Sequence, residues 1–481
     1  MSSGSHVFKN VFWLGCATGG SLVTSLVYGL LAARHLGPAD FGRFSLIIGV
    51  GALMSNMAQG AGTSVLTVLT AQRFRSPGEL LLPGMATQAL VGTVCLALSV
   101  PLVLILGRDR SLFVPAVVYS IGSVSLLVYS APIAIFRGLN QMQWSVAQTI
   151  AGLFTIVGVW VVVRQGATLN QIVAVNALSQ GIVFFFIVLI SSIRLLPKRH
   201  HFRIERPVIS EILRKTIGLS GVTVFQSIHW KVGLVMVQLL GGAYALGIYT
   251  AGAKPIENLR VVPMVLILSI FPSVSQMVTQ APHSLQRAQV SLVRVVLLFM
   301  LPLVGALIAL SPVVINFLYG SAYANASVVF SLSLLAVIPG TLHLILIMPL
   351  VANHAIGRLA MVYSAAIVVE AGVDLLLYSR IGLRGAVAGA VLASMVTAIL
   401  ADRYAFSNGR VLRDPRIVKM LIAGAISLAI PLSGIFASHR WFLCGLTIVT
   451  FLTGAWTLKS FTFRELRQLR TLFDHSGKEP T

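Results

Sequence analysis

Long apolar stretches alternate with short polar connectors along almost the whole chain. They recur from Phe12 to Leu458. A helix needs about 20 apolar residues to cross the hydrocarbon core of a bilayer, so each stretch is long enough to span one. The pattern therefore predicts an all-α integral membrane protein with fourteen spans. Their expected ranges are 12–33, 44–70, 80–106, 113–136, 144–163, 170–193, 217–240, 245–278, 290–316, 326–351, 359–379, 383–404, 417–437 and 441–458.

The basic residues of the connectors give an orientation. Of the 35 Lys and Arg residues, about 24 fall in the termini and alternate connectors, and about 8 fall in the intervening connectors. Basic connectors remain on the cytoplasmic side of a membrane, so both termini are expected in the cytoplasm. The densest basic segments are the connector 194–216 and the tail 459–481.

Composition excludes several classes of protein. Hydrophobic residues make up 57% of the chain and charged residues 10%, which is incompatible with a soluble domain of 481 residues. The net charge of +22 comes from residues that flank apolar stretches, so nucleic acid is not an expected partner. Cys16, Cys95 and Cys444 lie in spans without CxxC spacing. We expect them to be buried packing residues, not disulfides or metal ligands.

Two short motifs occur twice, in the same order. Gly37-Pro-Ala-Asp-Phe-Gly-Arg-Phe44 follows span one, and Gly242-Ala-Tyr-Ala-Leu-Gly-Ile-Tyr249 follows span seven. Arg164-Gln-Gly166 after span five is echoed by Arg380-Ile-Gly382 after span eleven. These echoes predict two pseudo-symmetric six-span lobes, followed by two further helices. Such parallel repeats around a central cavity are an architecture of transporters, and we favour transport over a duplication without that role.

The expected domains follow from this repeat. They are an N-terminal lobe 1–193, a basic cytoplasmic connector 194–216, a C-terminal lobe 217–404, an extra helix pair 405–458 and a basic cytoplasmic tail 459–481. No connector on the predicted outer side has room for a catalytic domain.

Three segments carry a family resemblance. They are Ala33–Ser45, Ile248–Asn258 with Phe271-Pro272 downstream, and Arg380–Gly389. They resemble the bacterial oligosaccharide flippases, or Wzx-type polysaccharide transporters. The superfamily of these proteins also contains lipid II flippases and multidrug and toxin extruders. The resemblance covers the first twelve spans well and the last two only by hydropathy.

This resemblance implies lobes that alternate between inward-open and outward-open states in the bacterial inner membrane. The implied cargo is an undecaprenyl-diphosphate-linked oligosaccharide destined for a surface polysaccharide. A polysaccharide polymerase and glycosyltransferases are the candidate protein partners beside the lipid bilayer itself. Spans one and two lack the interior arginines of lipid II flippases, which argues against a peptidoglycan precursor as cargo.

Few ionisable side chains lie inside the predicted spans, and they mark where a polar cargo would be handled. Such groups are costly in a bilayer, so they face a cavity or a partner. The six are Lys231, Lys254, Arg260, Glu257, Glu370 and Asp374. Polar neighbours on the same or facing spans are Asn56, Gln59, Gln226, His229 and Asn258.

Cationic side chains in a cavity would offset the desolvation of a lipid diphosphate. Lys254 and Arg260 are the first candidates for this contact, and Lys231 is the third. Asn258, Gln226, Asn56 and Gln59 are the further substrate-binding candidates. The alternative is that three cations and three acids pair as buried bridges that fix helix packing.

Glu370 and Asp374 lie four residues apart on one helix face and are candidates for a coupling proton or Na⁺. Pairing with Lys231 or Lys254 is the alternative for them, and Glu257 has the same two roles open to it. His229 could titrate near neutral pH, but a hydrogen-bonded packing histidine is the more common case.

The chain has no Walker A loop and no catalytic arrangement on an outer connector, so an enzyme is not expected and no cofactor or metal is implied. A membrane-embedded polysaccharide polymerase or glycosyltransferase is disfavoured for the same reason. A cation-coupled multidrug or metabolite exporter of the same superfamily remains the main alternative to a flippase.

Overall fold

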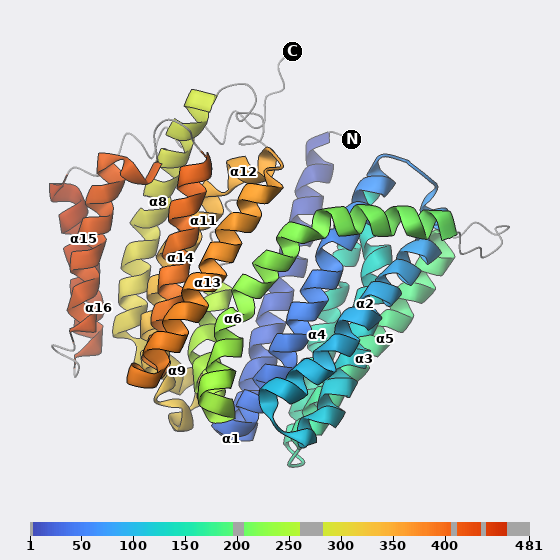
Figure 1. Ribbon diagram of the computed structural model, residues 1–481, viewed down its shortest axis with the longest axis horizontal. Coiled ribbons are helices and arrows are strands. Elements are labelled where there is room, and N and C mark those ends of the chain that lie inside the picture. The colour runs from blue at the N-terminus through green and yellow to red at the C-terminus, as the bar shows by residue number, and fades with distance from the viewer. Residues whose placement is uncertain (1–2, 196–205, 260–281, 406–410, 434–438, 459–481) are drawn as a thin grey trace. The chain divides into compact units, whose positions relative to one another are not determined.

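A computed structural model describes residues 3–195, 206–259, 282–405, 411–433 and 439–458. The chain forms two compact units, Met1–Thr250 and Ala251–Thr481. All regular structure in the described ranges is helical (Figure 1).

The first unit contains five long helices, two short 3-10 turns and most of a sixth helix. Their bounds are α1 Ser3–Ala71, α2 Pro77–Gly107, η1 Arg110–Leu112, α3 Phe113–Gly138, η2 Met142–Val146, α4 Ala147–Val163, α5 Leu169–Leu195 and α6 Arg206–Leu259. The second unit begins near the end of α6. Its further bounds are α8 Pro282–Ala309, α9 Ser311–Tyr319, η3 Ser321–Tyr323, α10 Ala326–Ser333, η4 Leu334–Ala336, α11 Val337–Leu346, α12 Met348–Ala352, α13 Ile356–Ile381, α14 Leu383–Ala405, η5 Val411–Arg413, α15 Pro415–Leu432 and α16 Arg440–Thr457.

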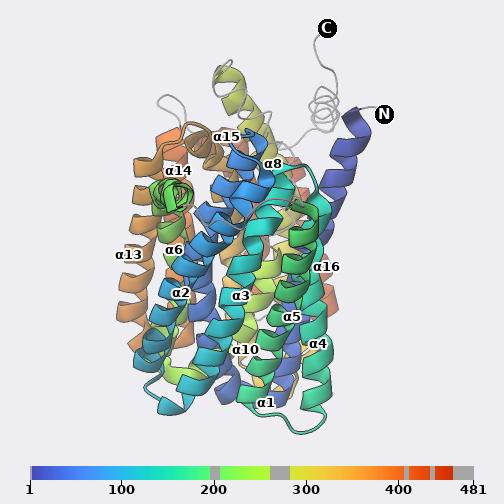
Figure 2. The ribbon, with the colours of Figure 1, turned by 90° about the vertical axis from the view of Figure 1, so that its right-hand side faces the viewer.

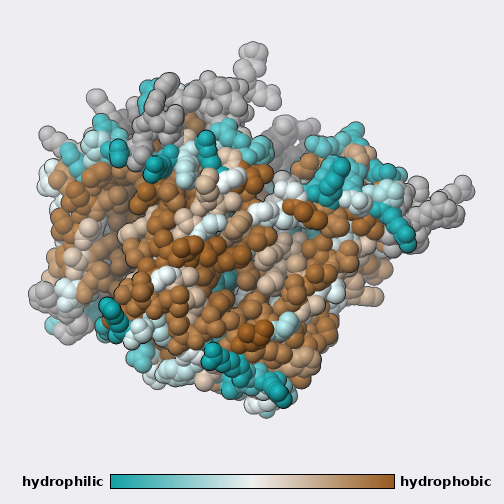
Figure 3. Space-filling model, viewed as in Figure 1, coloured by the Kyte–Doolittle hydropathy of each residue, from teal (hydrophilic) through white to brown (hydrophobic). Residues whose placement is uncertain are grey.

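Eleven helical stretches in the described part of the chain are long and apolar enough to cross a membrane. One of them, Phe12–Ala71, contains the first two predicted spans, and another, Ser220–Leu259, contains most of the seventh and the start of the eighth. The rest of span eight lies outside the described residues. The predicted all-helical membrane fold is confirmed. On the face drawn in Figure 3, apolar side chains cover the middle of each unit and hydrophilic ones gather near the helix ends.

Many large apolar side chains lie on the outer surface of the helices, where a bilayer would contact them. Large apolar side chains such as Phe317, Leu376 and Trp441 are more than two-thirds exposed, as expected for groups that contact lipid. All three cysteines are free, but Cys16 is exposed and the other two are half-buried. The prediction that they are buried was therefore wrong. An apolar side chain in a bundle surrounded by lipid has no need to be buried within protein.

Both copies of the first motif form the same kind of turn. The chain reverses inside α1 at Gly37 (φ 72°, ψ 173°) and inside α6 at Gly242 (φ 72°, ψ −172°). A positive φ of this size favours glycine, which explains why both copies place Gly there. Figures 1 and 2 show α1 descending from the N-terminus and returning after its turn.

The two turns also contact each other reciprocally, and both lie in the first unit. A Cβ on Gly42 would overlap the Ala243 carbonyl oxygen, and a Cβ on Gly247 would overlap the Pro38 carbonyl oxygen. In the motif alignment Gly42 matches Gly247 and Pro38 matches Ala243. The contact therefore has the pseudo-two-fold pattern expected of a duplicated element, with backbones so close that only glycine fits.

The second pair of echoes also has matching geometry. Gly166 (φ 77°), three residues after α4, and Gly382 (φ 60°), which caps α13, both adopt positive φ. The turn motifs are thus repeated in conformation as well as in sequence. The boundary between the compact units, at residue 250, does not coincide with the boundary that the repeat predicts. The division into lobes 1–193 and 217–404 stays a prediction.

The connector 194–216 is partly helical, because α6 already begins at Arg206. Val208 and Ile212, one turn apart, are buried against side chains near the ends of α1, α2 and α3. Arg214 and Lys215 are exposed, and the Lys215 ammonium lies 3.0 Å from Glu211. Figure 1 shows this first part of α6 lying crosswise over the first unit before the helix bends.

Candidate substrate site

The first unit places the predicted polar residues of α1 and α6 at one level. Gly60 meets the Thr223 side chain and Gly49 meets that of Leu234. Gly49 and Gly60 are eleven residues apart on α1, and their partners Thr223 and Leu234 are eleven residues apart on α6 in the opposite order. These parts of the two helices therefore run antiparallel in one register. That register brings Asn56 to the level of Ser227, next to Gln226 and one turn from Gln59.

The side chains of this polar level differ in burial. Asn56 is exposed, whereas Gln59, Gln226, His229 and Lys231 are half-buried. Asn56 lies near the middle of the second half of α1. The helix geometry thus collects amide, imidazole and ammonium groups in the interior of the spans.

The predicted cation of span eight is already paired. The Lys254 Nζ lies 3.0 Å from Glu257 Oε2, one turn later on α6, and the two side chains remain 31% and 42% exposed. The Asn258 Nδ2 donates to the Lys254 carbonyl oxygen at 3.3 Å, which fixes the amide beside the pair. Lys254 is twelve residues beyond the Gly242 turn, or about 18 Å along a helix, and so well inside the span. Arg260, the other first candidate, lies outside the described residues.

The predicted acidic pair of α13 is buried. Glu370 is 5% exposed and Asp374 is fully buried. Neither carboxylate oxygen of Asp374 has a hydrogen-bond partner among the described residues. A Cβ on Gly389 of α14 would overlap Asp374 Oδ1, so this glycine makes the room that the carboxylate occupies.

A buried polar cluster that the sequence reasoning missed joins the same helix pair, α13 and α14, to α11. His343 of α11 is within 3.4 Å of both the Thr397 carbonyl oxygen on α14 and the Tyr363 hydroxyl on α13. Tyr363 and Glu370 are seven residues apart and share the buried face of α13. Isolated histidines in apolar stretches carry little sequence signal, because most are packing residues. No group of three or more His, Cys, Asp or Glu side chains that could hold a metal occurs in the described ranges.

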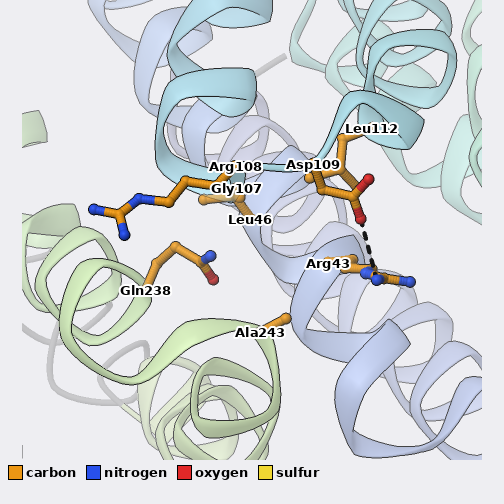
Figure 4. A pocket seen from close by; sticks show the side chains of 8 residues that line it. All are labelled: Arg43, Leu46, Gly107, Arg108, Asp109, Leu112, Gln238 and Ala243. Carbon is orange, nitrogen blue, oxygen red and sulfur yellow. Dashed lines mark ion pairs between the residues drawn. The ribbon is translucent and has the colours of Figure 1, made fainter.

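A cavity of about 280 Å³ lies elsewhere in the first unit, beside the Gly37 turn (Figure 4). We call it the Arg43 cavity. Its lining includes Arg43 and Leu46 of α1, Arg108, Asp109 and Leu112 after α2, and Gln238 of α6. The predicted substrate-binding residues do not line it, because they lie further along the spans.

Comparison with known proteins decides the family. A family model described as "Polysaccharide biosynthesis protein" matches residues 7–278, more than half of the chain. The chain belongs to this family. The predicted resemblance to polysaccharide flippases is thereby confirmed. A search of curated proteins gave no match.

Solved structures share the fold of this polysaccharide biosynthesis family member. The lipid II flippase MurJ in an inward closed conformation superposes with a TM-score of 0.72 at 16% identity, over 94% of this chain and 99% of that one. An inward-facing multidrug resistance transporter of the MATE family gives a TM-score of 0.65 at 15% identity, over 86% and 96%. A transporter from Pyrococcus furiosus, whose binding pocket is described as reversed in polarity, gives 0.58 at 16% identity, over 82% and 94%.

At these identities the likeness shows a shared fold and no more. The second and third are described as transporters of the MOP superfamily, and the three superpositions cover between 82% and 94% of this chain. The protein is therefore a multi-pass membrane protein with a transporter fold.

Proposed function

We propose that this protein is a flippase for undecaprenyl-diphosphate-linked oligosaccharide units. It moves them from the cytoplasmic to the periplasmic face of the inner membrane by alternating access, for export of a surface polysaccharide, with both termini in the cytoplasm. The family match over residues 7–278 is the observation that carries the proposal. The fold shared with a lipid II flippase supports the flipping step.

The Lys254–Glu257 pair supports a role in holding the diphosphate. Without cargo, Glu257 neutralises the ammonium inside the span and limits the cost of the charge. Because both side chains stay partly exposed, an incoming phosphate oxygen can replace the carboxylate as the acceptor. Arg260 and Lys231 are proposed as the further cations, and Asn258, Gln226, Asn56 and Gln59 as polar contacts to the rest of the head group.

The buried carboxylate of Asp374 supports a role in coupling. An ionised group without a partner at such a position costs several kcal/mol, so it is held protonated or with a bound cation such as Na⁺. Glu370, one turn earlier, is the second group proposed for this site. His229 in the first unit is proposed as a further titratable group.

The decisive experiment measures lipid-linked saccharides in a deletion strain. We expect them to accumulate on the cytoplasmic face, inaccessible to a membrane-impermeant lectin, while surface polysaccharide is lost. Unchanged pools with normal surface polysaccharide would contradict the proposal. They would favour a cation-coupled multidrug or metabolite exporter, which the MATE-family fold also supports. A polymerase or glycosyltransferase would instead leave the lipid-linked units accessible outside or fail to make them.

The role of Lys254 needs a test that separates binding from packing. Lys254→Ala is expected to abolish export at normal protein level, whereas Glu257→Gln, which leaves the ammonium available, is expected to retain it. A packing bridge would instead be damaged equally by both changes. Lys215→Ala is the matched control, because Lys215 forms a 3.0 Å pair with Glu211 on the same helix before the span begins. Normal export by Lys254→Ala would remove this residue from the site.

A further inference from the structure

The Arg43 cavity has a fixed set of charges at its edge. The Arg43 guanidinium lies 3.1 Å from Asp109 Oδ2 (Figure 4). It also lies 3.0 Å from Asp40 Oδ1, one turn earlier on α1. The Ser111 N–H donates to Asp109 Oδ1 at 2.9 Å, and hydrogen bonding from Ser111, followed by the charge of Arg43, lowers the pKa of the Asp109 carboxyl. The carboxylate is therefore ionised at any physiological pH, and its orientation is set before a ligand arrives.

A buried amide completes one wall of the cavity. Gln238 is 6% exposed, and its Nε2 donates to the Leu106 carbonyl oxygen at 3.2 Å. Its Oε1 has no hydrogen-bond partner among the described residues. A buried acceptor left without a donor is destabilising, so this oxygen offers a site for a hydroxyl donor that binds in the cavity.

Arg108 occupies a backbone position that suits glycine better. It ends α2 in the left-handed region, at φ 50° and ψ 30°, where its N–H caps the Leu104 carbonyl oxygen. Its guanidinium forms no ion pair within the described ranges, although Asp109 is its neighbour in sequence. A cation at a helix C-terminus interacts favourably with the helix dipole, and because this guanidinium forms no ion pair in that part of the chain it also remains available as a hydrogen-bond donor at the cavity.

The structure of the turn does not require the charges. The second copy of the motif makes the same reversal at Gly242, with Ala245 where the first copy has Asp40 and Ile248 where it has Arg43. The reciprocal glycine contact is formed by both copies alike. Asp40 and Arg43 are thus additions to a turn that folds without them; Arg43 lines the cavity, and Asp40 pairs with it.

We propose that the Arg43 cavity binds one neutral sugar residue of the saccharide cargo. This inference rests on the proposed function for the identity of the cargo and adds a site to it. Arg43 and Arg108 offset Asp40 and Asp109, so the surroundings carry no net charge and do not favour a phosphate. Carboxylate and amide acceptors beside guanidinium donors match the hydroxyls of a sugar, which both donate and accept.

The size and remaining walls agree with a single ring. A volume of 280 Å³ is just below the range of about 300–1,000 Å³ usual for drug-sized ligands. Leu46 and Leu112 supply apolar surface for the C–H groups of the ring. Ala243 adds the second turn to the wall, so a bound sugar contacts both copies of the motif. The predicted orientation places the cavity at the periplasmic end of the spans, the side to which the proposed function delivers the sugars.

The test measures binding of a defined probe to the full chain in lipid nanodiscs. The probe is the oligosaccharide released by mild acid from the lipid-linked saccharides of the producing cells, and saturation-transfer NMR follows its titration. Arg108→Gly is the principal variant, because glycine relieves the left-handed backbone and keeps the fold. We expect the dissociation constant to rise about tenfold, as for the loss of a hydrogen bond from a charged donor.

Arg110→Gln is the matched control, since Arg110 is a neighbouring exposed arginine outside the cavity wall. It is expected to bind as the wild type does. Asp109→Asn is the second variant and is expected to weaken binding as well. Equal affinity of wild type and Arg108→Gly, or no binding by a wild type that does flip its cargo, would overturn the cavity assignment.

Competing ligands separate the possible sources of the hydroxyls. Free glucose that binds the wild type better than the released oligosaccharide would identify a periplasmic sugar, not cargo. Inorganic pyrophosphate that displaces the probe would identify an anion site. Either result overturns the proposal. Unchanged lipid-linked pools in the deletion strain would instead refute the proposed function. The affinities of the variants relative to wild type test only the cavity assignment, so the two failures can be told apart.

Discussion

The reciprocal contact of the two glycine turns predicts a large cost for a single methyl group. In Gly42→Ala the new Cβ would occupy the position of the Ala243 carbonyl oxygen. A backbone carbonyl cannot rotate away as a side chain can, so the two turns must separate. Overpacking of this kind costs about 1–3 kcal/mol, and a backbone clash belongs at the upper end. Alanine gains about 1 kcal/mol over glycine in a helix, which leaves a net loss of about 2 kcal/mol.

The assay is thermal unfolding of the purified protein in detergent, with Gly29→Ala as control. Gly29 is on the same helix and has open space at its Cβ position, so its substitution shows the helix gain alone. For a unit of this size, about 2 kcal/mol corresponds to a midpoint about 4–8 °C lower. Gly42→Ala is expected to fall by that amount, and Gly29→Ala to equal or exceed the wild type.

Gly247→Ala tests the symmetry of the contact. Alone it should cost as much as Gly42→Ala, because its Cβ would overlap the Pro38 carbonyl oxygen. In the double variant the turns are already apart, so the combined loss should be clearly less than the sum of the two. The reasoning would be refuted if Gly42→Ala unfolded at the same temperature as Gly29→Ala. It would also be refuted if the stability loss of the double variant equalled the sum of the two single losses.

Three further predictions follow from other contacts. Gly389→Ala places a methyl group on Asp374 Oδ1 and should abolish export driven by a proton or Na⁺ gradient in proteoliposomes; Gly372→Ala, with open space, should leave export intact. Because the pKa of Asp109 is lowered in the folded state, its carboxylate stabilises the fold above the usual pKa of about 3.9, and this stabilisation is lost as pH falls through the folded-state pKa. The difference in melting temperature between wild type and Asp109→Asn should therefore be constant from pH 5 to 8 and shrink below about pH 4. Ile212→Ala should destabilise the first unit by about 2–4 kcal/mol in denaturant unfolding, and Ile217→Ala, which is 65% exposed, should be near neutral; equal effects would contradict the docking of α6.

Hydropathy and turn chemistry predict most of this fold from sequence. A bilayer imposes a minimum apolar length on every span, so the pattern alone locates α2, α3, α13 and α14 to within a few residues. The Gly37 and Gly242 reversals were readable as a repeated motif. The helical start of α6 was missed, since Arg206–Thr216 carries charges that lower its hydropathy. The i, i+4 spacing of Val208 and Ile212 was the available signal.

The candidate site was less predictable, because its contacts join distant parts of the chain. Lys254 and Glu257 are three residues apart, so their pairing is a local consequence of helix geometry. The Arg43 cavity instead needs three connectors or helix ends to meet, which a single sequence does not specify. Gly389, which ends the Arg380–Gly389 motif, makes room for the Asp374 carboxylate fifteen residues earlier in the chain. Each had a sequence signal, but only packing links them.

Comparison of the two turn copies separates what the fold needs from what a ligand would use. The copies agree at Gly37 and Gly242 and at Gly42 and Gly247, where backbone geometry leaves no choice. They differ in charge elsewhere: at the same offset, Lys254 of the second copy corresponds to Gly49 of the first, just as Arg43 of the first corresponds to Ile248. The first copy thus carries its charges at the turn and the second carries them inside the span. A cargo with a hydroxylated end and a diphosphate end would meet two different chemistries at two depths, which a symmetric pair of copies could not provide.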